Sequence, residues 1–230
     1  MIRTIFFDAA GTLLEPAERV GETYARFARQ SGVTVDPLAL ERGFRTAFSS
    51  APPLAFPPGA GDRHARERAW WRGVVFDAFA YAAPDTPSLP LDQVFAAVFE
   101  HFARPDAWRV FADVRPTLRL LHTRGLRLAV VSNFDTRLHG LLDGLGLAGW
   151  FHSVVLSSEC GSAKPDARIF AVALRATGAT PQATLHVGDS EELDVRGAKR
   201  AGVAALRVDR GGTSSAAAIG TLLELVERLD

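Results

Sequence analysis

The sequence predicts an α/β protein with a doubly wound parallel sheet and an all-helical domain inserted after the first strand. Two observations support this fold class. Short apolar runs rich in β-branched residues alternate with helical patterns through most of the chain, and one region near the N-terminus shows helical patterns alone. Because strand, helix and strand in series form a parallel sheet, this order indicates a Rossmann-like core.

Five runs are predicted to be buried strands, because each is rich in β-branched or aliphatic residues and is bounded by polar or turn residues. They span residues 2–7, 126–132, 153–157, 183–189 and 204–208. Helical patterns alternate with them at residues 117–125, 137–146, 166–178 and 194–202. Each of these patterns finishes on a glycine, the residue that best adopts the left-handed conformation at a helix C-terminus.

Residues 16–106 break this alternation. They contain four helical patterns, at residues 18–32, 37–50, 66–83 and 91–103. A stretch with four prolines, residues 49–62, is expected to be a loop between two of these helices. We therefore expect an α/β core formed by residues 1–15 and 107–230, and a helical domain formed by residues 16–106.

Composition limits the possible partners. The 26 basic residues balance the 26 acidic ones, so no overall charge attracts the protein to nucleic acid or to an anionic membrane. A small polar ligand is the better expectation. No apolar run approaches the roughly 20 residues that span a bilayer, and the single cysteine, Cys160, cannot form an internal disulfide. A cytoplasmic protein is expected, and its oligomeric state is left open.

Polar residues follow four of the predicted strands. They are Asp8, Ser132 with Asn133, the segment 157–159, and Asp189. Ligands bind at the carboxyl ends of the strands in an open α/β sheet, so these residues are expected to lie at one edge. The first strand is not followed by a G-x-G-x-x-G pattern, which argues against a nicotinamide or flavin dehydrogenase.

The same segments resemble the four motifs of the haloacid dehalogenase superfamily. In order along the chain they read "DAAGT", "VVSN", "KPD" with the following "ARIF", and "GDSEELD". The resemblance covers residues 1–15 and about 107–210, and the helical insertion is similar to the small helical cap of that superfamily. It implies a hydrolase of the dehalogenase and phosphatase-like subgroup. The cap is expected to exclude water and to select a small phosphorylated substrate.

The resemblance also implies the chemical roles. Asp8 is the expected nucleophile, because a carboxylate can attack a phosphoryl group and form an aspartyl intermediate. Donors are then needed for the charge on the transferring group, and the matching positions are Thr12, Ser132, Asn133 and Lys164. Lys164 is one of only two lysines beside 24 arginines, so its presence in a motif is conspicuous.

A metal site is implied by the first and fourth motifs. Mg²⁺ typically takes one or two carboxylates together with waters and substrate oxygens. By resemblance, Asp8 and Asp189 bind it through their side chains and Ala10 through its backbone carbonyl. Asp194 is expected to orient Lys164 or a metal-bound water, although an acid that stabilises the first turn of a helix is an alternative. His186 is expected to be a packed strand residue.

Ala10 departs from the family pattern. Phosphatases of the family usually carry a second aspartate there, which protonates the leaving group, and loss of a general acid typically costs 10²- to 10⁴-fold. Three hypotheses therefore remain: a Mg²⁺-dependent phosphatase with weak or specialised activity, a metal-independent 2-haloacid dehalogenase, and a non-catalytic relative that binds a phosphorylated ligand or a protein. Retention of Asp8, Lys164 and Asp189 together favours the first.

Overall fold

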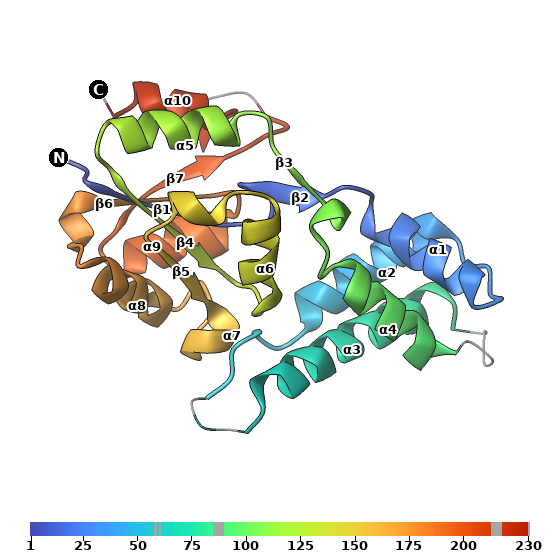
Figure 1. The fold of residues 1–230 in the computed structure, drawn as a ribbon. Helices are drawn as coiled ribbons and strands as arrows, with labels where there is room; N and C mark the ends of the chain where they lie inside the picture. Colours follow the sequence, from blue (N-terminus) through green and yellow to red (C-terminus); the bar gives the residue numbers. More distant parts are fainter. Residues whose placement is uncertain (58, 60, 85–89, 213–217, 230) are drawn as a thin grey trace. The chain divides into compact units, whose positions relative to one another are not determined.

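The computed structural model describes residues 1–57, 59, 61–84, 90–212 and 218–229. The chain divides into two compact units, which Figure 1 shows as a sheet with its helices and a separate group of helices. The sheet unit consists of Met1–Glu15, Leu54–Ala60 and Val110–Asp230, and the helical unit of Pro16–Pro53 and Gly61–Arg109. This division differs from the expected one at two places: Leu54–Ala60 belongs to the sheet unit, and residues 107–109 belong to the helical unit.

The sheet unit contains six parallel strands, which confirms the predicted fold class. They are β1 (Thr4–Phe7), β4 (Arg127–Ser132), β5 (Ser153–Leu156), β6 (Thr184–Gly188), β7 (Ala204–Val208) and β8 (Ala218–Ile219). Their order in the sheet is β5-β4-β1-β6-β7-β8, and every neighbouring pair is parallel. Strand β1 therefore lies in the middle, and its carboxyl end lies between those of β4 and β6.

Helices cover the sheet (Figure 1). They are α5 (Val114–Thr123), α6 (Arg137–Gly144), α7 (Ser157–Cys160), α8 (Ala167–Thr177), α9 (Gly197–Arg200) and α10 (Leu223–Glu227), with a π-helical segment η4 (Glu191–Arg196) and the 3₁₀ turns η2 (Ala148–Trp150) and η3 (Pro181–Ala183). A further 3₁₀ turn, η1 (Pro105–Ala107), belongs to the helical unit. Phe6 of β1 and Val131 of β4 pack against Ile169 and Phe170 of α8. The glycines predicted to end helical segments all have positive φ, namely Gly125, Gly146, Gly178 and Gly202.

Three short strands were not expected from the sequence. One is β8 at the edge of the large sheet, and the other two, β2 (Leu14–Pro16) and β3 (Trp108–Val110), form a separate two-stranded sheet. Strands of two or three residues are too short to show the alternation that identifies a strand in a sequence. Their pairing depends on which segments the fold brings together.

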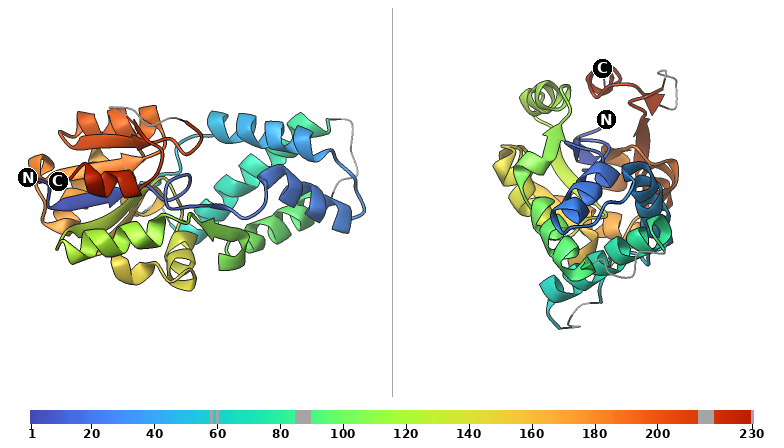
Figure 2. Two further views of the ribbon diagram at one scale, coloured as in Figure 1. Left: turned by 90° about the horizontal axis from the view of Figure 1, so that it is seen from above. Right: turned by 90° about the vertical axis from the view of Figure 1, so that its right-hand side faces the viewer.

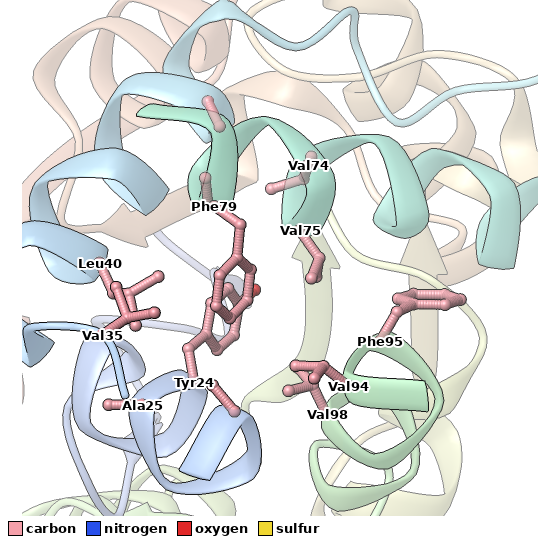
Figure 3. Packing of buried hydrophobic residues seen from close by; sticks show 13 residues of the cluster. Tyr24, Ala25, Val35, Leu40, Val74, Val75, Phe79, Val94, Phe95 and Val98 are labelled. Atoms are coloured by element: carbon pink, nitrogen blue, oxygen red, sulfur yellow. The ribbon is translucent and has the colours of Figure 1, made fainter. Parts of the chain in front are cut away.

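The helical unit contains α1 (Val20–Gln30), α2 (Pro37–Ser50), α3 (Arg63–Ala82) and α4 (Leu91–His101), which confirms the predicted all-helical insertion. The four helices pack around one apolar cluster, and Figure 2 shows them from two further sides. Figure 3 shows the centre of this apolar cluster, where the rings of Tyr24 and Phe79 stack with centroids 6.0 Å apart. Leu40 lies beside these rings, Val94 and Val98 lie near Phe95, and all of them are buried.

Close helix packing in this unit depends on a glycine. A Cβ atom at Gly43 of α2 would lie 2.4 Å from the backbone oxygen of Ala78 in α3. Real Cβ atoms do not approach an oxygen so closely, so only glycine allows the two backbones to meet there. No helix in the described part of the chain is both long and apolar enough to cross a membrane.

Candidate active site

Asp8 follows β1 directly and is buried at the carboxyl edge of the sheet. Its backbone N–H donates to the carbonyl of Val187 in β6, so the chain is held in the sheet up to this residue. The chain then turns sharply, because the backbone N–H groups of Leu13 and Leu14 both donate to the carbonyl of Ala9. The carboxylate is thus presented at the end of the central strand, where the sequence predicted a ligand site.

Ser132 ends β4, the neighbouring strand, and Asn133 follows it, but the two residues have different roles. The Ser132 hydroxyl donates to Asp8 Oδ1 at 2.8 Å. The Asn133 side chain instead holds the backbone of Lys164: its Nδ2 donates to the Lys164 carbonyl at 2.9 Å, and its Oδ1 accepts from the Lys164 N–H at 2.7 Å. In the structure the Asn133 amide positions Lys164, and a donor role of its backbone or side chain toward the reacting group stays a prediction.

Lys164 joins two carboxylates that lie far apart in the sequence. Its Nζ is buried and lies 2.6 Å from Asp8 Oδ1 and 2.6 Å from Asp194 Oδ1. Asp194 belongs to η4, and its Oδ2 accepts from the backbone N–H of Ser190 at 2.9 Å. The predicted association of Asp8, Lys164 and Asp194 is therefore present as a continuous chain of hydrogen bonds.

Asp8, Lys164 and Asp194 differ in how far neighbouring charges offset the effect of burial on their pKa values. Burial alone would lower the pKa of Lys164, but the adjacent Asp194 and Asp8 outweigh it and raise that pKa, so the lysine is charged. Burial would raise the pKa of Asp194, yet Lys164 and His186 hold it well below its usual range. Burial does raise the pKa of Asp8, because Lys164 offsets it only in part and the Asp194 charge adds to it.

Asp189 follows β6 and completes an acidic cluster with Asp8 and Asp194. One oxygen of each carboxylate lies within 4.8 Å of the others. The Asp189 side chain is open to solvent on one side, but partial desolvation, and then the charges of Asp8 and Asp194, raise its pKa to about 6. Three carboxylates against one lysine favour a further cation, so the cluster can hold a metal ion.

Gly11 makes the close approach of Asp189 possible. Its φ is +81°, in the left-handed region, and a Cβ atom there would lie 2.5 Å from Asp189 Oδ2. Any larger residue would combine backbone strain with a collision against the carboxylate. The turn of the first motif therefore requires glycine at position 11, because the Asp189 carboxylate of the fourth motif lies against it.

Thr12 and Ala10 complete the first motif. Thr12 is fully buried, and its hydroxyl has no hydrogen-bond partner within the described residues. Its predicted role as a donor to the transferring group stays a prediction. Ala10 is half-buried and forms an isolated bridge with Leu14. Its methyl group can neither donate nor accept a proton.

The polar segment after β5 does not join the cluster of Asp8. The Ser157 hydroxyl donates to the backbone carbonyl of Leu54 at 2.6 Å and so fastens the Leu54 segment to the sheet unit. Glu159 pairs with His139 at 3.0 Å near the surface. Location at the same sheet edge was therefore a correct expectation for Asp8, Ser132 and Asp189, but it did not by itself define a shared site.

Two residues near this edge, His186 and Arg210, make contacts that the sequence did not predict. His186 lies inside β6, and its Nε2 lies 2.9 Å from Asp194 Oδ1. Arg210 donates to the Thr12 carbonyl at 2.5 Å and to both oxygens of Asp113 at 3.0 Å. Neither residue belongs to a polar group at a predicted strand end. The only signal for His186 is a polar residue in an otherwise apolar strand, and Arg210 gives no signal among 24 arginines.

Comparison with known proteins defines the class to which this fold and site belong. The family model described as haloacid dehalogenase-like hydrolase matches residues 2–202. The chain therefore belongs to the haloacid dehalogenase-like hydrolase family, as its four motifs indicated.

Individual proteins resemble the chain over different extents. The chain is 40% identical over 202 residues to haloacid dehalogenase-like hydrolase domain-containing protein 3 of Homo sapiens, covering 88% of this chain and 80% of that protein. It is 48% identical over 108 residues to a phosphoserine phosphatase of Thermus thermophilus, covering 46% of this chain and 41% of that protein. Among solved structures, L-2-haloacid dehalogenase of Xanthobacter autotrophicus shares the fold, with a TM-score of 0.73, 19% identity, and coverage of 100% and 98% of the two chains.

Proposed function

We propose that this protein is a Mg²⁺-dependent phosphohydrolase in which Asp8 attacks the phosphoryl group of a small phosphorylated substrate. The observation that carries the proposal is the buried bridge of Lys164 between Asp8 and Asp194, with Ser132 on the same Asp8 oxygen. Both hydrogen bonds accepted by the Asp8 side chain in the described part of the chain reach Oδ1. Oδ2 is therefore the oxygen better placed to attack phosphorus.

The proposed reaction has two steps. First, an Asp8 carboxylate oxygen forms a bond to phosphorus while the bond from phosphorus to the leaving oxygen breaks. Then water attacks the aspartyl phosphate, releases phosphate and restores Asp8. The Lys164 ammonium and the Ser132 hydroxyl lie beside Asp8, where they can donate to the oxygens of the transferring group as its charge redistributes.

Asp8 and Asp189, with the backbone carbonyl of Ala10, are the proposed ligands of Mg²⁺. Asp194 is less suitable as a direct ligand, because its Oδ1 already faces Lys164 and His186 and its Oδ2 accepts from Ser190. Bound Mg²⁺ would offset the negative charge that the carboxylates and the phosphoryl oxygens bring together. The all-oxygen donor set and the raised pKa of Asp189 both fit a hard cation.

Ala10 limits the leaving groups that such a site can expel. Without an acid at this position, a poor leaving alkoxide must obtain its proton from water or from the substrate itself. Relatives named phosphoserine phosphatase and glyceraldehyde 3-phosphate phosphatase support a small phosphorylated substrate. We therefore propose weak or specialised turnover, with substrates that have good leaving groups favoured. The helical unit is proposed to act as the cap that selects among them.

A second function is favoured by Ala10 itself. A relative that binds a phosphorylated ligand without hydrolysing it has no need of a proton donor at this position. The dehalogenase alternative has less support, because a metal-independent enzyme has no need of the exposed Asp189 beside two buried carboxylates. The similarity to a dehalogenase structure at 19% identity concerns the fold alone.

Turnover assays separate these functions. With Mg²⁺, the protein is expected to hydrolyse acetyl phosphate or p-nitrophenyl phosphate slowly, Ala10→Asp to increase the rate by about 10²-fold, and Asp8→Asn to abolish it. If neither the wild type nor Ala10→Asp turns over while calorimetry shows Mg²⁺ binding, the binding-protein function is supported instead. Release of halide from 2-chloropropionate in EDTA would identify a dehalogenase.

A further inference from the structure

His186 is a buried titratable residue without a role in the proposed reaction. It lies in the middle of β6, has no exposed surface, and contacts the ring of Phe170 edge-on at a centroid distance of 5.0 Å. Its Nε2 lies 2.9 Å from Asp194 Oδ1, and its Nδ1 has no hydrogen-bond partner within the described residues. A histidine that served only to fill space would not require this contact with a carboxylate.

The protonation state of His186 follows from its surroundings. Burial lowers the pKa of the imidazole, and the nearby Asp194 offsets this only in part, so the ring is neutral near pH 7. Asp194 is ionised and can only accept hydrogen bonds. The shared hydrogen must therefore be on Nε2, and His186 is a fixed neutral donor to Asp194.

This donor completes the set that holds the Asp194 carboxylate. Oδ1 accepts from His186 Nε2 and from Lys164 Nζ, and Oδ2 accepts from the Ser190 N–H. The carboxylate also packs directly on the backbone of β6, since a Cβ atom at Gly188 would lie 2.1 Å from Asp194 Cγ. The orientation of Asp194 in turn determines where its short contact to Lys164 can form.

We propose that His186 is a positioning residue, whose Nε2–H holds Asp194 so that the Lys164 ammonium stays between Asp194 and Asp8. The catalytic consequence rests on the proposed function, in which Lys164 contacts the transferring phosphoryl group. The structural claim is that His186 keeps the Lys164 ammonium group ordered. It is independent of the proposed function, because it concerns only the order and hydrogen exchange of that group. The two parts can therefore be tested separately.

Three substitutions separate hydrogen bonding from packing. His186→Gln places an amide nitrogen close to the position of Nε2 and keeps the donor. His186→Leu keeps a similar volume and removes the donor. His186→Asn keeps polarity but is too short to reach Asp194, so it serves where the leucine variant does not fold. Circular dichroism and thermal melting establish that each compared variant is folded.

The first measurement uses the lysine content of the chain. Protein labelled with ¹⁵N-lysine has only two Nζ groups, at Lys164 and Lys199, and Lys199 is exposed. Lys199→Arg then assigns the remaining signal to Lys164. We expect the Lys164 ammonium to be protected from hydrogen exchange in the wild type and His186→Gln, and to exchange at least about 10-fold faster in His186→Leu or His186→Asn. Equal exchange in all folded variants would overturn the inference.

The second measurement is steady-state turnover of acetyl phosphate with Mg²⁺, with Ala10→Asp as the background so that rates are measurable. We expect kcat to fall at least about 10-fold in His186→Leu with KM unchanged, and His186→Gln to stay within about 3-fold. An equal loss in His186→Gln would assign a packing role and contradict the proposal. If no background turns over, the proposed function fails while the exchange measurement still decides whether His186 positions Lys164.

Discussion

Two clusters of charged residues in the sheet unit differ in how completely their charges are paired. Around Lys164, the single ammonium group faces Asp8 and Asp194, and Asp189 lies nearby. Around Asp113, a single carboxylate accepts from Arg210, from the Thr221 hydroxyl at 2.8 Å and from the Leu222 N–H at 2.7 Å. The first cluster has too few positive charges for its carboxylates, whereas the second pairs its one carboxylate with a guanidinium and two further donors.

The pKa values of the two carboxylates follow this difference. Burial raises the pKa of Asp8, and Lys164 offsets that effect only in part. Burial would also raise the pKa of Asp113, but the Leu222 N–H, Arg210 and Thr221 outweigh it and hold the pKa below its usual value. The fold thus favours the charge on Asp113 and disfavours the charge on Asp8. The negative charge of Asp8, which its neighbours offset only in part, is therefore available to interact with a ligand.

The cluster of Asp113 also contacts the turn of the first motif through Arg210. Arg210 lies over the ring of Phe111, 3.7 Å from its centroid, and donates to the Thr12 carbonyl. It therefore ties the turn after Asp8 to the chain segment that enters α5. We interpret this cluster as structural support for the site and the cluster of Lys164 as the site itself.

The largest expected effect follows from removing the shared cation. Lys164→Met leaves Asp8 and Asp194 buried beside each other without a lysine, and loss of one partner of a buried pair costs about 3–5 kcal/mol. We expect the free energy of unfolding, measured with urea in EDTA, to fall by this amount and turnover to vanish. Lys199→Met, at the exposed second lysine, is the matched control and should change neither quantity. A loss below about 1 kcal/mol for Lys164→Met would contradict the bridging role.

A smaller effect is expected at the structural cluster. Asp113→Asn replaces one acceptor oxygen by a donor group and leaves the Arg210 guanidinium without its counter-charge, which should cost about 1.5–3 kcal/mol. Urea denaturation at pH 7 measures this change. Asp92→Asn, which breaks the exposed pair with Arg72, should be much less harmful. Equal effects at the two positions would show that burial of the Asp113 cluster contributes nothing.

The contribution of Asp113 should depend on pH in a defined direction. Its pKa is lower in the folded protein than in the unfolded chain, where an aspartate titrates near 4. The unfolded state therefore binds the proton first, and the stabilisation is present above about pH 4 and lost as the pH falls below it. The difference in unfolding free energy between wild type and Asp113→Asn should be constant from about pH 5 to 7 and should narrow below about pH 4. A difference that widens there would reverse the assigned sign.

The smallest effect on stability is expected at Asp8, although substitution there should abolish turnover. The raised pKa means that the folded protein disfavours the charged carboxylate, and the side-chain amide introduced by Asp8→Asn still offers an oxygen to Ser132 and Lys164. Without metal, Asp8→Asn should therefore lose no stability and gain about 1 kcal/mol or less. Turnover should be abolished. A loss of stability like that of Asp113→Asn would remove the distinction between the two clusters.

Much of the site could be predicted from local patterns. Asp8 and Asp189 follow an apolar strand run and Ser132 ends one, and parallel strands bring their carboxyl ends to one edge. Lys164 stood out because lysine is so rare in this chain, and the motif resemblance linked it to Asp8. For Asn133 the sequence indicated the position but not the two hydrogen bonds that its amide makes with the Lys164 backbone. A sequence places a residue near a site more readily than it predicts which atom its side chain will contact.

From the sequence alone one could predict the five longer strands of the large sheet and the main helices in order, the glycines that end the helices, and the polar residues at the sheet edge. These features depend on local periodicity and on backbone conformations that single residues allow. Three contacts became visible only in the folded chain: His186 with Asp194, Arg210 with Thr12, and Ser157 with the Leu54 segment. Such contacts join residues far apart in the chain through side-chain orientation and burial, which depend on the packed arrangement of several elements at once.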